Sequence, residues 1–369
     1  MGKASIFSVT RGIAVMTAPN PNDPPVRDVV PAHWFDPAPL EAWLTREVEG
    51  FGTGMRVQQF QGGASNPTFL LTTDGPDGPL RYVLRKKPPG VLLASAHQVD
   101  REYRVMKALE GKVPVPRMRA LCTDDAVIGT AFYVMDYLPG RIFRDATLPD
   151  LTPAERAAVY DDLNATLAKL HQVDFRAVGL EDFGKAGGYF ERQVARWTKQ
   201  YRGAETEVIP EMEALIEALP ARIPADDSVS IAHGDYRLEN VMFHPTEPRL
   251  IAVLDWELCT IGHPLADIAY NGFIWRSHSP SWGSLDGVDF STSGIPTEAD
   301  YVAAYCRRTG RDGIEDWPFY MAFGIFRLAS ISQGVYRRVL SGQAASERAA
   351  ENGTPMLAKQ ALAILEGRE

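Results

Sequence analysis

The stretch IAHGDYRLENVMFHPTEPRLIAVLDWELC, residues 231–259, is the most informative part of the sequence. Within it the tripeptide H-G-D ends at Asp235, and Asn240 follows five residues later. Asp255 comes directly after the apolar residues 251–254, the second of two short apolar runs. Two adjacent runs of this kind predict a hairpin. That hairpin would bring Asn240 and Asp255 together beside the loop that carries Asp235.

The residue types in this stretch indicate a particular chemistry. An amide oxygen beside a carboxylate provides hard ligands that suit Mg²⁺, which otherwise keeps waters and substrate phosphates. Asp235 lies on the same loop and would accept a proton from a substrate hydroxyl. A loop Asp, an Asn five residues later and a second Asp on the metal are typical of phosphoryl-transfer sites. We therefore predict that Asp235 is catalytic and that Asn240 and Asp255 bind Mg²⁺.

Three segments of the chain resemble one family of enzymes. YVLRKKPPG (82–90), FYVMDYLPGR (132–141) and HGDYRLENVMFHP (233–245) are similar to the aminoglycoside phosphotransferase and choline kinase superfamily, small-molecule relatives of protein kinases. Within that superfamily they resemble most the phosphotransferase domain fused to some acyl-CoA dehydrogenases, and its free-standing bacterial relatives. The resemblance extends from about residue 40 to 345. It implies ATP and Mg²⁺ as cofactors and a hydroxyl of a small molecule as acceptor.

The order of elements along the chain favours an α+β fold. Residues 36–138 predict a helix, three strands, a second helix and two more strands, which is typical of an antiparallel sheet with helices. Residues 139–369 predict helices, interrupted only by the two strands of the hairpin. Residues 1–35 predict an irregular extension. The resemblance implies a bilobal protein-kinase-like fold, with a small nucleotide-binding N-lobe that has one key helix and a large C-lobe for the catalytic loop and acceptor.

The resemblance also implies a loop that covers the nucleotide phosphates. Residues 62–66, with the sequence GGASN, resemble that loop, in which backbone N–H groups, Ser65 and Asn66 would contact the phosphates. A plain hairpin turn is the alternative. Backbone groups of Asp136 and Leu138 would contact the adenine edge, with Met135 behind it.

A cation for the α- and β-phosphates is expected on the strand at 81–85, where protein kinases use Lys. We choose Arg85, because strand alternation places it on the same face as Val83, which would line the adenine pocket. Lys86 is the alternative, as is a solvated basic strand end. Glu102 borders the apolar face of the following helix and is the expected partner of Arg85, with Asp100 as its rival.

The remaining polar residues near Asp235 have supporting roles in this interpretation. Arg237 is the second catalytic candidate, because it stands where many protein kinases carry a Lys that touches the transferred phosphoryl group. We expect His233 to order the catalytic loop and Asp267 to anchor it by hydrogen bonds. Glu257 either assists the metal or faces solvent.

Two other classes of protein compete with this interpretation. His233, Asp235, His263 and Asp267 could form a hydrolase site for Zn²⁺ or Mn²⁺, but that site would leave Asn240, Asp255 and the β-rich lobe without a role. A catalytically inactive pseudokinase that only binds ligands is the other alternative. The Arg in place of the kinase Lys supports it, and the complete set of acids and amide opposes it.

Composition limits the partners. The net charge of −9 disfavours general binding of nucleic acid or anionic lipid. Three widely spaced cysteines exclude a disulfide framework and are typical of a reducing compartment. Residues 1–15 lack a signal-peptide pattern because Arg11 interrupts their apolar part, and Met16 is an alternative start. We therefore expect a cytoplasmic protein with no nucleic acid and no membrane among its partners; the sequence does not indicate an oligomeric state.

The acceptor is expected on the helical lobe, at 185–205 and 265–340. Aromatic and basic residues gather in the second of these segments: Tyr270, Phe273, Trp275, Trp317, Phe323, Phe326, Arg327, Arg337 and Arg338. We expect most of them in the core or at the surface, and any that line a pocket suit an apolar or anionic acceptor. Because residues 265–285 contain a single acid, Asp267, we prefer a hydroxyacyl-CoA-like metabolite to an aminoglycoside; a kinase of the choline or aminoglycoside type is the alternative.

Overall fold

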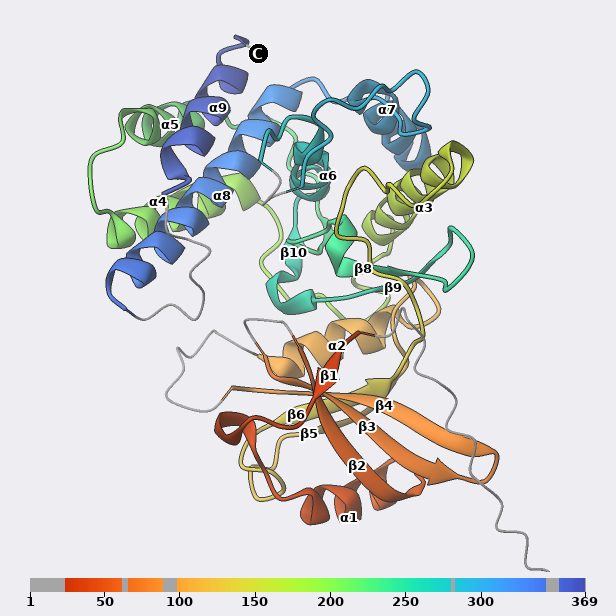
Figure 1. Cartoon of the computed structure of the whole chain (residues 1–369). Coiled ribbons are helices and arrows are strands. Elements are labelled where there is room, and N and C mark those ends of the chain that lie inside the picture. Colours follow the sequence, from red (N-terminus) through yellow and green to blue (C-terminus); the bar gives the residue numbers. More distant parts are fainter. Residues whose placement is uncertain (1–23, 62–65, 89–97, 280–282, 343–351, 369) are drawn as a thin grey trace, which may run out of the picture.

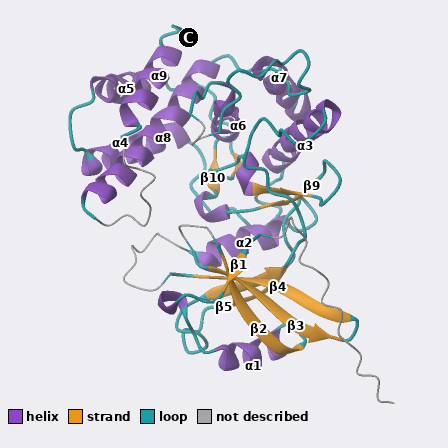
Figure 2. Ribbon diagram, in the orientation of Figure 1, coloured by secondary structure: helices purple, strands orange, loops and turns teal. Residues whose placement is uncertain are grey.

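A computed structural model of the chain describes residues 24–61, 66–88, 98–279, 283–342 and 352–368 (Figure 1). A β-sheet lobe and a larger helical lobe lie one above the other, as Figure 2 shows by element type. The first 23 residues and residues 62–65, which include Ser65 of the predicted phosphate loop, lie outside the described residues.

The N-lobe is built on one antiparallel sheet of six strands in the order β1-β2-β3-β4-β6-β5. The strands are β1 (Val26–Arg27), β2 (Thr53–Phe60), β3 (Thr68–Gly75), β4 (Gly78–Lys86), β5 (Met118–Cys122) and β6 (Phe132–Asp136). The D-G-P-D-G-P segment, residues 74–79, makes the tight turn between β3 and β4, with Gly75 paired to Gly78. The irregular extension predicted for residues 1–35 is wrong at β1, which pairs with β2 through Val26 and Phe60.

Two helices lie against opposite faces of this sheet (Figure 1). The helix α1 (Pro37–Glu47) begins at Asp36, whose carboxylate accepts a hydrogen bond from the Ala38 N–H, and it buries Leu40 and Leu44 against the outer face. The helix α2 (Val99–Leu109) lies on the side of the C-lobe and buries Glu102 along with its apolar stripe. This position brings Glu102 to the cleft side of the sheet.

Two arginines of α2 fix that helix to the C-lobe. The Arg101 guanidinium donates to the Phe183 carbonyl at 2.6 Å. Arg104 donates to the Gly179 carbonyl at 2.8 Å and pairs with Asp182. These contacts hold α2 in one position relative to the catalytic loop.

The C-lobe is mostly helical. Its helices are α3 (Pro153–His171), α4 (Tyr189–Ala204), α5 (Pro210–Ala221), α6 (Pro264–Gly272), α7 (Glu298–Thr309), α8 (Trp317–Leu340) and α9 (Thr354–Leu365). Four short strands interrupt them: β7 (Ser230–Ala232) pairs with β10 (Thr260–Gly262), and β8 (Val241–Phe243) pairs with β9 (Leu250–Val253). The prediction of only two strands here is wrong. The strand β8 is as short as β7 and β10, but it adjoins β9 in the sequence, whereas β7 and β10 pair across the whole catalytic loop and the β8–β9 hairpin.

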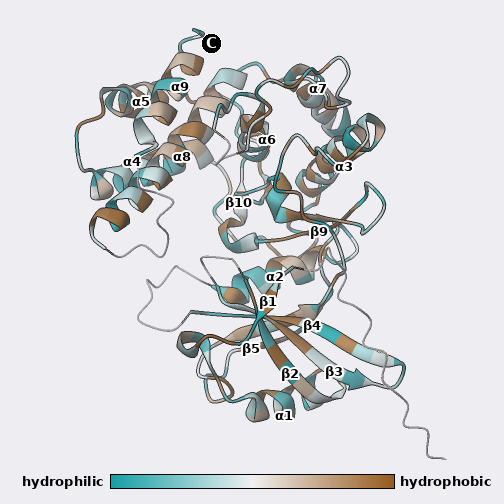
Figure 3. Cartoon of the chain, in the orientation of Figure 1, coloured by the Kyte–Doolittle hydropathy of each residue, from teal (hydrophilic) through white to brown (hydrophobic). Residues whose placement is uncertain are grey.

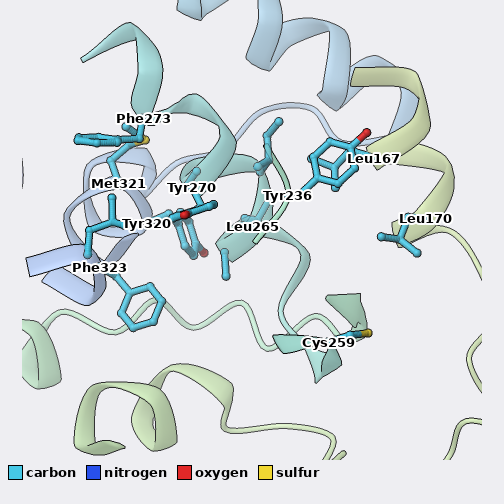
Figure 4. Packing of buried hydrophobic residues seen from close by; sticks show 14 of the residues in the cluster. Leu167, Leu170, Tyr236, Cys259, Leu265, Tyr270, Phe273, Tyr320, Met321 and Phe323 are labelled. Atoms are coloured by element: carbon cyan, nitrogen blue, oxygen red, sulfur yellow. The ribbon is translucent and has the colours of Figure 1, made fainter. Parts of the chain in front are cut away.

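The core of the C-lobe surrounds α6 and α8. Figure 3 shows that hydrophobic residues are frequent along these helices, and Figure 4 shows Tyr270, Phe273, Met321 and Phe323 in the packed core. None of the described helices has both the length and the apolarity needed to cross a bilayer.

Candidate active site

The hairpin of β8 and β9 places the two expected metal ligands side by side. Val241 and Val253 are paired, and the Leu254 N–H donates to the Asn240 carbonyl at 2.8 Å. Asp255 follows β9 with a φ of 61°, in the left-handed region that Asp and Asn tolerate better than most residues. This sharp turn at Asp255 ends the strand directly beside the catalytic loop.

Asp235 is held by donors at both of its carboxylate oxygens. Oδ2 accepts from the Asn240 side-chain nitrogen at 2.6 Å, and the same nitrogen donates to the Asp235 carbonyl at 2.9 Å. Oδ1 accepts from the Tyr270 hydroxyl at 2.6 Å and lies 3.8 Å from Nε of Arg237. Because the Asn240 nitrogen faces Asp235, its amide oxygen is left for a cation. This donor set fits Mg²⁺, which Asn240 and Asp255 would hold.

His233 and Asp267 fix the backbone of the catalytic loop. The buried Asp267 carboxylate accepts from the N–H groups of His233 and Gly234 at 2.6 and 2.8 Å. The His233 ring donates to the Leu254 carbonyl at 2.9 Å and accepts from the Asp235 N–H at 3.1 Å. These bonds match the roles expected of His233 and Asp267.

The charge of Asp267 is maintained despite its burial. Burial raises the pKa of this carboxyl, but the hydrogen bond from His171 and the backbone donor at Gly234 outweigh that effect and hold the pKa below its ordinary value. The His171 side chain is buried on α3, and its Nε2 lies 3.3 Å from the Asp267 carboxylate. An ionised Asp267 therefore remains available to order the loop.

Arg85 connects the N-lobe to the metal ligands. Its Nε lies 3.2 Å from Glu102, and one terminal nitrogen lies 2.8 Å from Asp255 and 3.6 Å from Glu257. Lys86 faces the opposite side of β4, where its ammonium lies 5.3 Å from the Phe35 ring. The geometry thus brings Arg85, and not Lys86, to the cleft, paired with Glu102 and not Asp100.

Glu102 is surrounded by donors as well as by apolar side chains. It accepts from the Asn66 amide at 2.8 Å and from the Tyr133 hydroxyl at 3.0 Å. Burial raises the pKa of Glu102 to about 7, against the lowering effect of Arg85. Asn66, expected at the phosphates, has its amide nitrogen on Glu102 and so supports the ion pair.

A cavity of about 250 Å³ lies between the sheet and the β8–β9 hairpin. Its lining includes Val83, Arg85, Met135, Asp136, Leu138, Met242, Leu254 and Asp255. Asp136 donates its N–H to the Arg117 carbonyl at 2.9 Å, and its carboxylate pairs with Arg119. The Asp136 N–H is therefore engaged within the sheet, and the adenine contacts expected of Asp136 and Leu138 stay a prediction; Asp136, Leu138 and Met135 all border this cavity.

The hydrolase alternative finds no support. In the described parts of the chain, no group of three or more His, Cys, Asp and Glu side chains is placed to hold a metal ion. His263 begins α6, where its ring accepts from the Leu265 N–H at 3.2 Å and donates to the Asp226 carbonyl at 3.1 Å. It therefore belongs to the packing of α6 and not to a metal site.

Substituting His263 by Asn should reduce the acid sensitivity of the fold. Burial lowers the pKa of His263 to about 4, whereas an unfolded His takes up its proton near 6.5. The unfolded chain binds more protons between these values, so stability falls as pH drops from about 6.5 to 4, by about 3 kcal/mol from this group. Asn keeps the helix cap, and chemical unfolding at pH 7 and 4.5 should show a smaller loss than in the wild type.

His278→Asn is the matched control, because the His278 side chain is 70% exposed. We expect this variant to lose as much stability on acidification as the wild type. An equal loss in His263→Asn would contradict the assignment to His263.

Two residues of the site were not predicted in their observed roles. Tyr270 of α6 and Arg327 of α8 were expected only as members of an aromatic and basic group on the acceptor side. Tyr270 contacts Asp235, and the Arg327 guanidinium donates to the Gly234 carbonyl. Neither contact has a local signal, because the partners are 35 and 93 residues apart in the chain.

The other members of that group lie away from the catalytic loop or within the core. Phe273, Phe323 and Phe326 are buried, as expected of core residues. Arg337 is exposed in its contact with the Glu205 carbonyl. Tyr270 and Arg327 are thus the members of the group with contacts to the loop.

This fold and this site define the class of kinase-like small-molecule phosphotransferases. The chain belongs to the phosphotransferase enzyme family, whose model matches residues 56–323, and it is a small-molecule kinase. Its structure resembles that of a Ralstonia eutropha protein assigned to the aminoglycoside phosphotransferases, with 47% identity, a TM-score of 0.83 and coverage of 90% of this chain and 99% of the other. Choline kinase from Cryptosporidium parvum shares the fold, with a TM-score of 0.57, 13% identity and coverage of 90% and 95%.

Curated relatives carry a different name. The chain is 46% identical over 329 residues to human acyl-CoA dehydrogenase family member 11, and this match covers 87% of this chain and 41% of the relative. It is 45% identical over 337 residues to mouse acyl-CoA dehydrogenase family member 10, and this match covers 90% of this chain and 31% of the relative. The chain therefore spans less than half the length of these relatives.

Proposed function

We propose that this protein transfers the γ-phosphoryl group of Mg-ATP to a hydroxyl of a small molecule. The observation that carries the proposal is the convergence of Asp235, Asn240 and Asp255 beside a cavity that reaches the N-lobe. Asn240 and Asp255 would hold Mg²⁺, which supplies charge neutralisation at the phosphates when it is bound.

Each charged residue of the chain has a distinct part in the transfer. Asp235 orients the acceptor hydroxyl and takes its proton as the new oxygen–phosphorus bond forms and the bond between γ-phosphorus and ADP breaks. Arg237, 3.8 Å from Asp235, offsets charge on the transferred group. Arg85, oriented by Glu102, contacts the α- and β-phosphates. Ser65, outside the described residues, remains our candidate for the phosphate loop.

The acceptor that we propose is a hydroxyacyl thioester such as a hydroxyacyl-CoA. Two relatives that share this segment are named as acyl-CoA dehydrogenase family members, which favours an acyl thioester. The position of Asp267 also favours this acceptor. Asp267 is buried beneath the catalytic loop, so its carboxylate is not exposed to bind a polycation. An aminoglycoside site needs several exposed carboxylates, and residues 265–285 provide no other acid.

A panel of acceptors tests this proposal. ADP release from Mg-ATP should be measured with hydroxyacyl-CoAs of several chain lengths, choline and an aminoglycoside, and each product should be identified by mass spectrometry. We expect a phosphorylated hydroxyacyl-CoA and no phosphorylated aminoglycoside. The matching acyl-CoAs without the hydroxyl are the control and should give no product. Binding of Mg-ATP without any product across the panel would favour the pseudokinase alternative.

A further inference from the structure

Arg327 is a buried cation that has no acidic partner within the described parts of the chain. Its residue is 7% exposed, and no carboxylate of the described residues lies within ion-pairing distance of its guanidinium. Its Nε is buried and makes no hydrogen bond to the described residues. Burying an unpaired charge costs free energy, so its retention calls for a specific contact.

The contacts of Arg327 are with the catalytic loop and with aromatic rings. The guanidinium donates to the Gly234 carbonyl, one residue before Asp235. It also lies 5.2 Å from the centre of the Tyr270 ring and 5.5 Å from that of Trp197. Cation–π contacts of this kind compensate part of the cost of burial.

Tyr270 completes the connection to the general base. Tyr270 and Asp267 are three residues apart on α6, so they share the face of that helix that meets the loop. Asp267 binds the loop backbone, whereas Tyr270 donates to Oδ1 of Asp235 at 2.6 Å. Figure 4 shows Tyr270 among the aromatic side chains of α6 and α8, a setting that fixes the phenol.

We propose that Tyr270 and Arg327 are positioning residues for Asp235. The phenol fixes the orientation of the Asp235 carboxylate opposite the bond from Asn240, and the guanidinium supports both the phenol ring and the Gly234 carbonyl. The acceptor hydroxyl then has one remaining direction of approach to Oδ1. This inference rests on the proposed function for its catalytic consequence, but the ordering of the loop does not depend on turnover.

The first test measures turnover. Tyr270→Phe removes only the hydroxyl, and we expect kcat to fall by about 10- to 100-fold while the KM for ATP stays unchanged. Tyr301→Phe is the matched control, because the buried Tyr301 hydroxyl makes a 2.6 Å bond to Asn271, next to Tyr270, without touching the loop. That control should keep the wild-type kcat.

The second test requires no turnover. Hydrogen–deuterium exchange at residues 233–236 should be about tenfold faster in Arg327→Met than in Tyr301→Phe, as expected for the loss of a charge-assisted hydrogen bond. Arg327→Lys, which keeps the charge, should restore part of the protection. Faster exchange in a protein that transfers no phosphoryl group would sustain the positioning role and refute the proposed function.

The variants Tyr270→Phe and Arg327→Met can also refute the positioning role. Wild-type kcat in Tyr270→Phe, or exchange in Arg327→Met no faster than in the Tyr301→Phe control, would overturn the proposal. Should Arg327→Met fail to fold, the Tyr270→Phe measurements alone decide it, with exchange at 233–236 in place of turnover if the wild type is inactive.

Discussion

Asp235→Asn is expected to lower kcat for phosphoryl transfer by about 10³-fold. The substitution keeps the size of the side chain but removes the charge that accepts the proton. The oxygen of the new amide can accept from the Asn240 side-chain nitrogen, and its nitrogen can donate to the Tyr270 hydroxyl oxygen, so Asn240 stays in place. We therefore expect the KM for ATP to change little, because the loss falls on the acceptor hydroxyl.

Glu247→Gln is the matched control for Asp235→Asn. Glu247 lies in the turn between β8 and β9, where its exposed carboxylate pairs with Arg249 at 3.1 Å. We expect this variant to retain nearly all of the wild-type kcat. Full activity in Asp235→Asn, measured as ADP release with the acceptor that the panel identifies, would refute the role of Asp235.

The sequence predicted the residues of the site whose neighbours lie close to them along the chain. Asn240 and Asp255 flank one hairpin, so two apolar runs were enough to infer that they are neighbours. The α+β class followed in the same way, from strands long enough to alternate and helices long enough to show a stripe. The strands β1, β7 and β10, of two or three residues, had no such pattern, and β8, equally short, was inferred only because it adjoins β9 in the sequence.

The choice between Arg85 and Lys86 shows what the alternation of side chains along a strand cannot predict. A strand pattern separates two faces, but it does not say which face meets the second lobe. The position of α2 decides this, because Glu102 is buried on the cleft side and Arg85 is its partner. The roles of Tyr270 and Arg327 depend on how α6 and α8 pack against the loop, and no local pattern contains that information.

Asp255→Asn is expected to lower kcat/KM for Mg-ATP by about 10³-fold. The variant keeps a side-chain oxygen but loses its negative charge. Asp255 is the charged one of the two expected metal ligands, since Asn240 is neutral, so Mg²⁺ should bind more weakly. Asn is the right replacement because Asp255 has a φ of 61°, which Asn tolerates, whereas Ala would add about 1–2 kcal/mol of strain. The fold should persist, since Arg85 keeps its pair with Glu102.

A titration with Mg²⁺ separates this prediction from a general loss of activity. Asp255→Asn should need much more Mg²⁺ for half-maximal turnover, and excess Mg²⁺ should recover part of the lost rate. Glu257→Gln should be measured alongside it. The Glu257 carboxylate lies 3.6 Å from the Arg85 guanidinium, and from the sequence it was expected either to assist the metal or to face solvent. A shifted Mg²⁺ requirement in Glu257→Gln would assign that carboxylate to the metal as well. An unchanged requirement in Asp255→Asn would instead mean that the divalent ion is held elsewhere, because an acid that neutralises the ion directly cannot be replaced by an amide without weakening its hold.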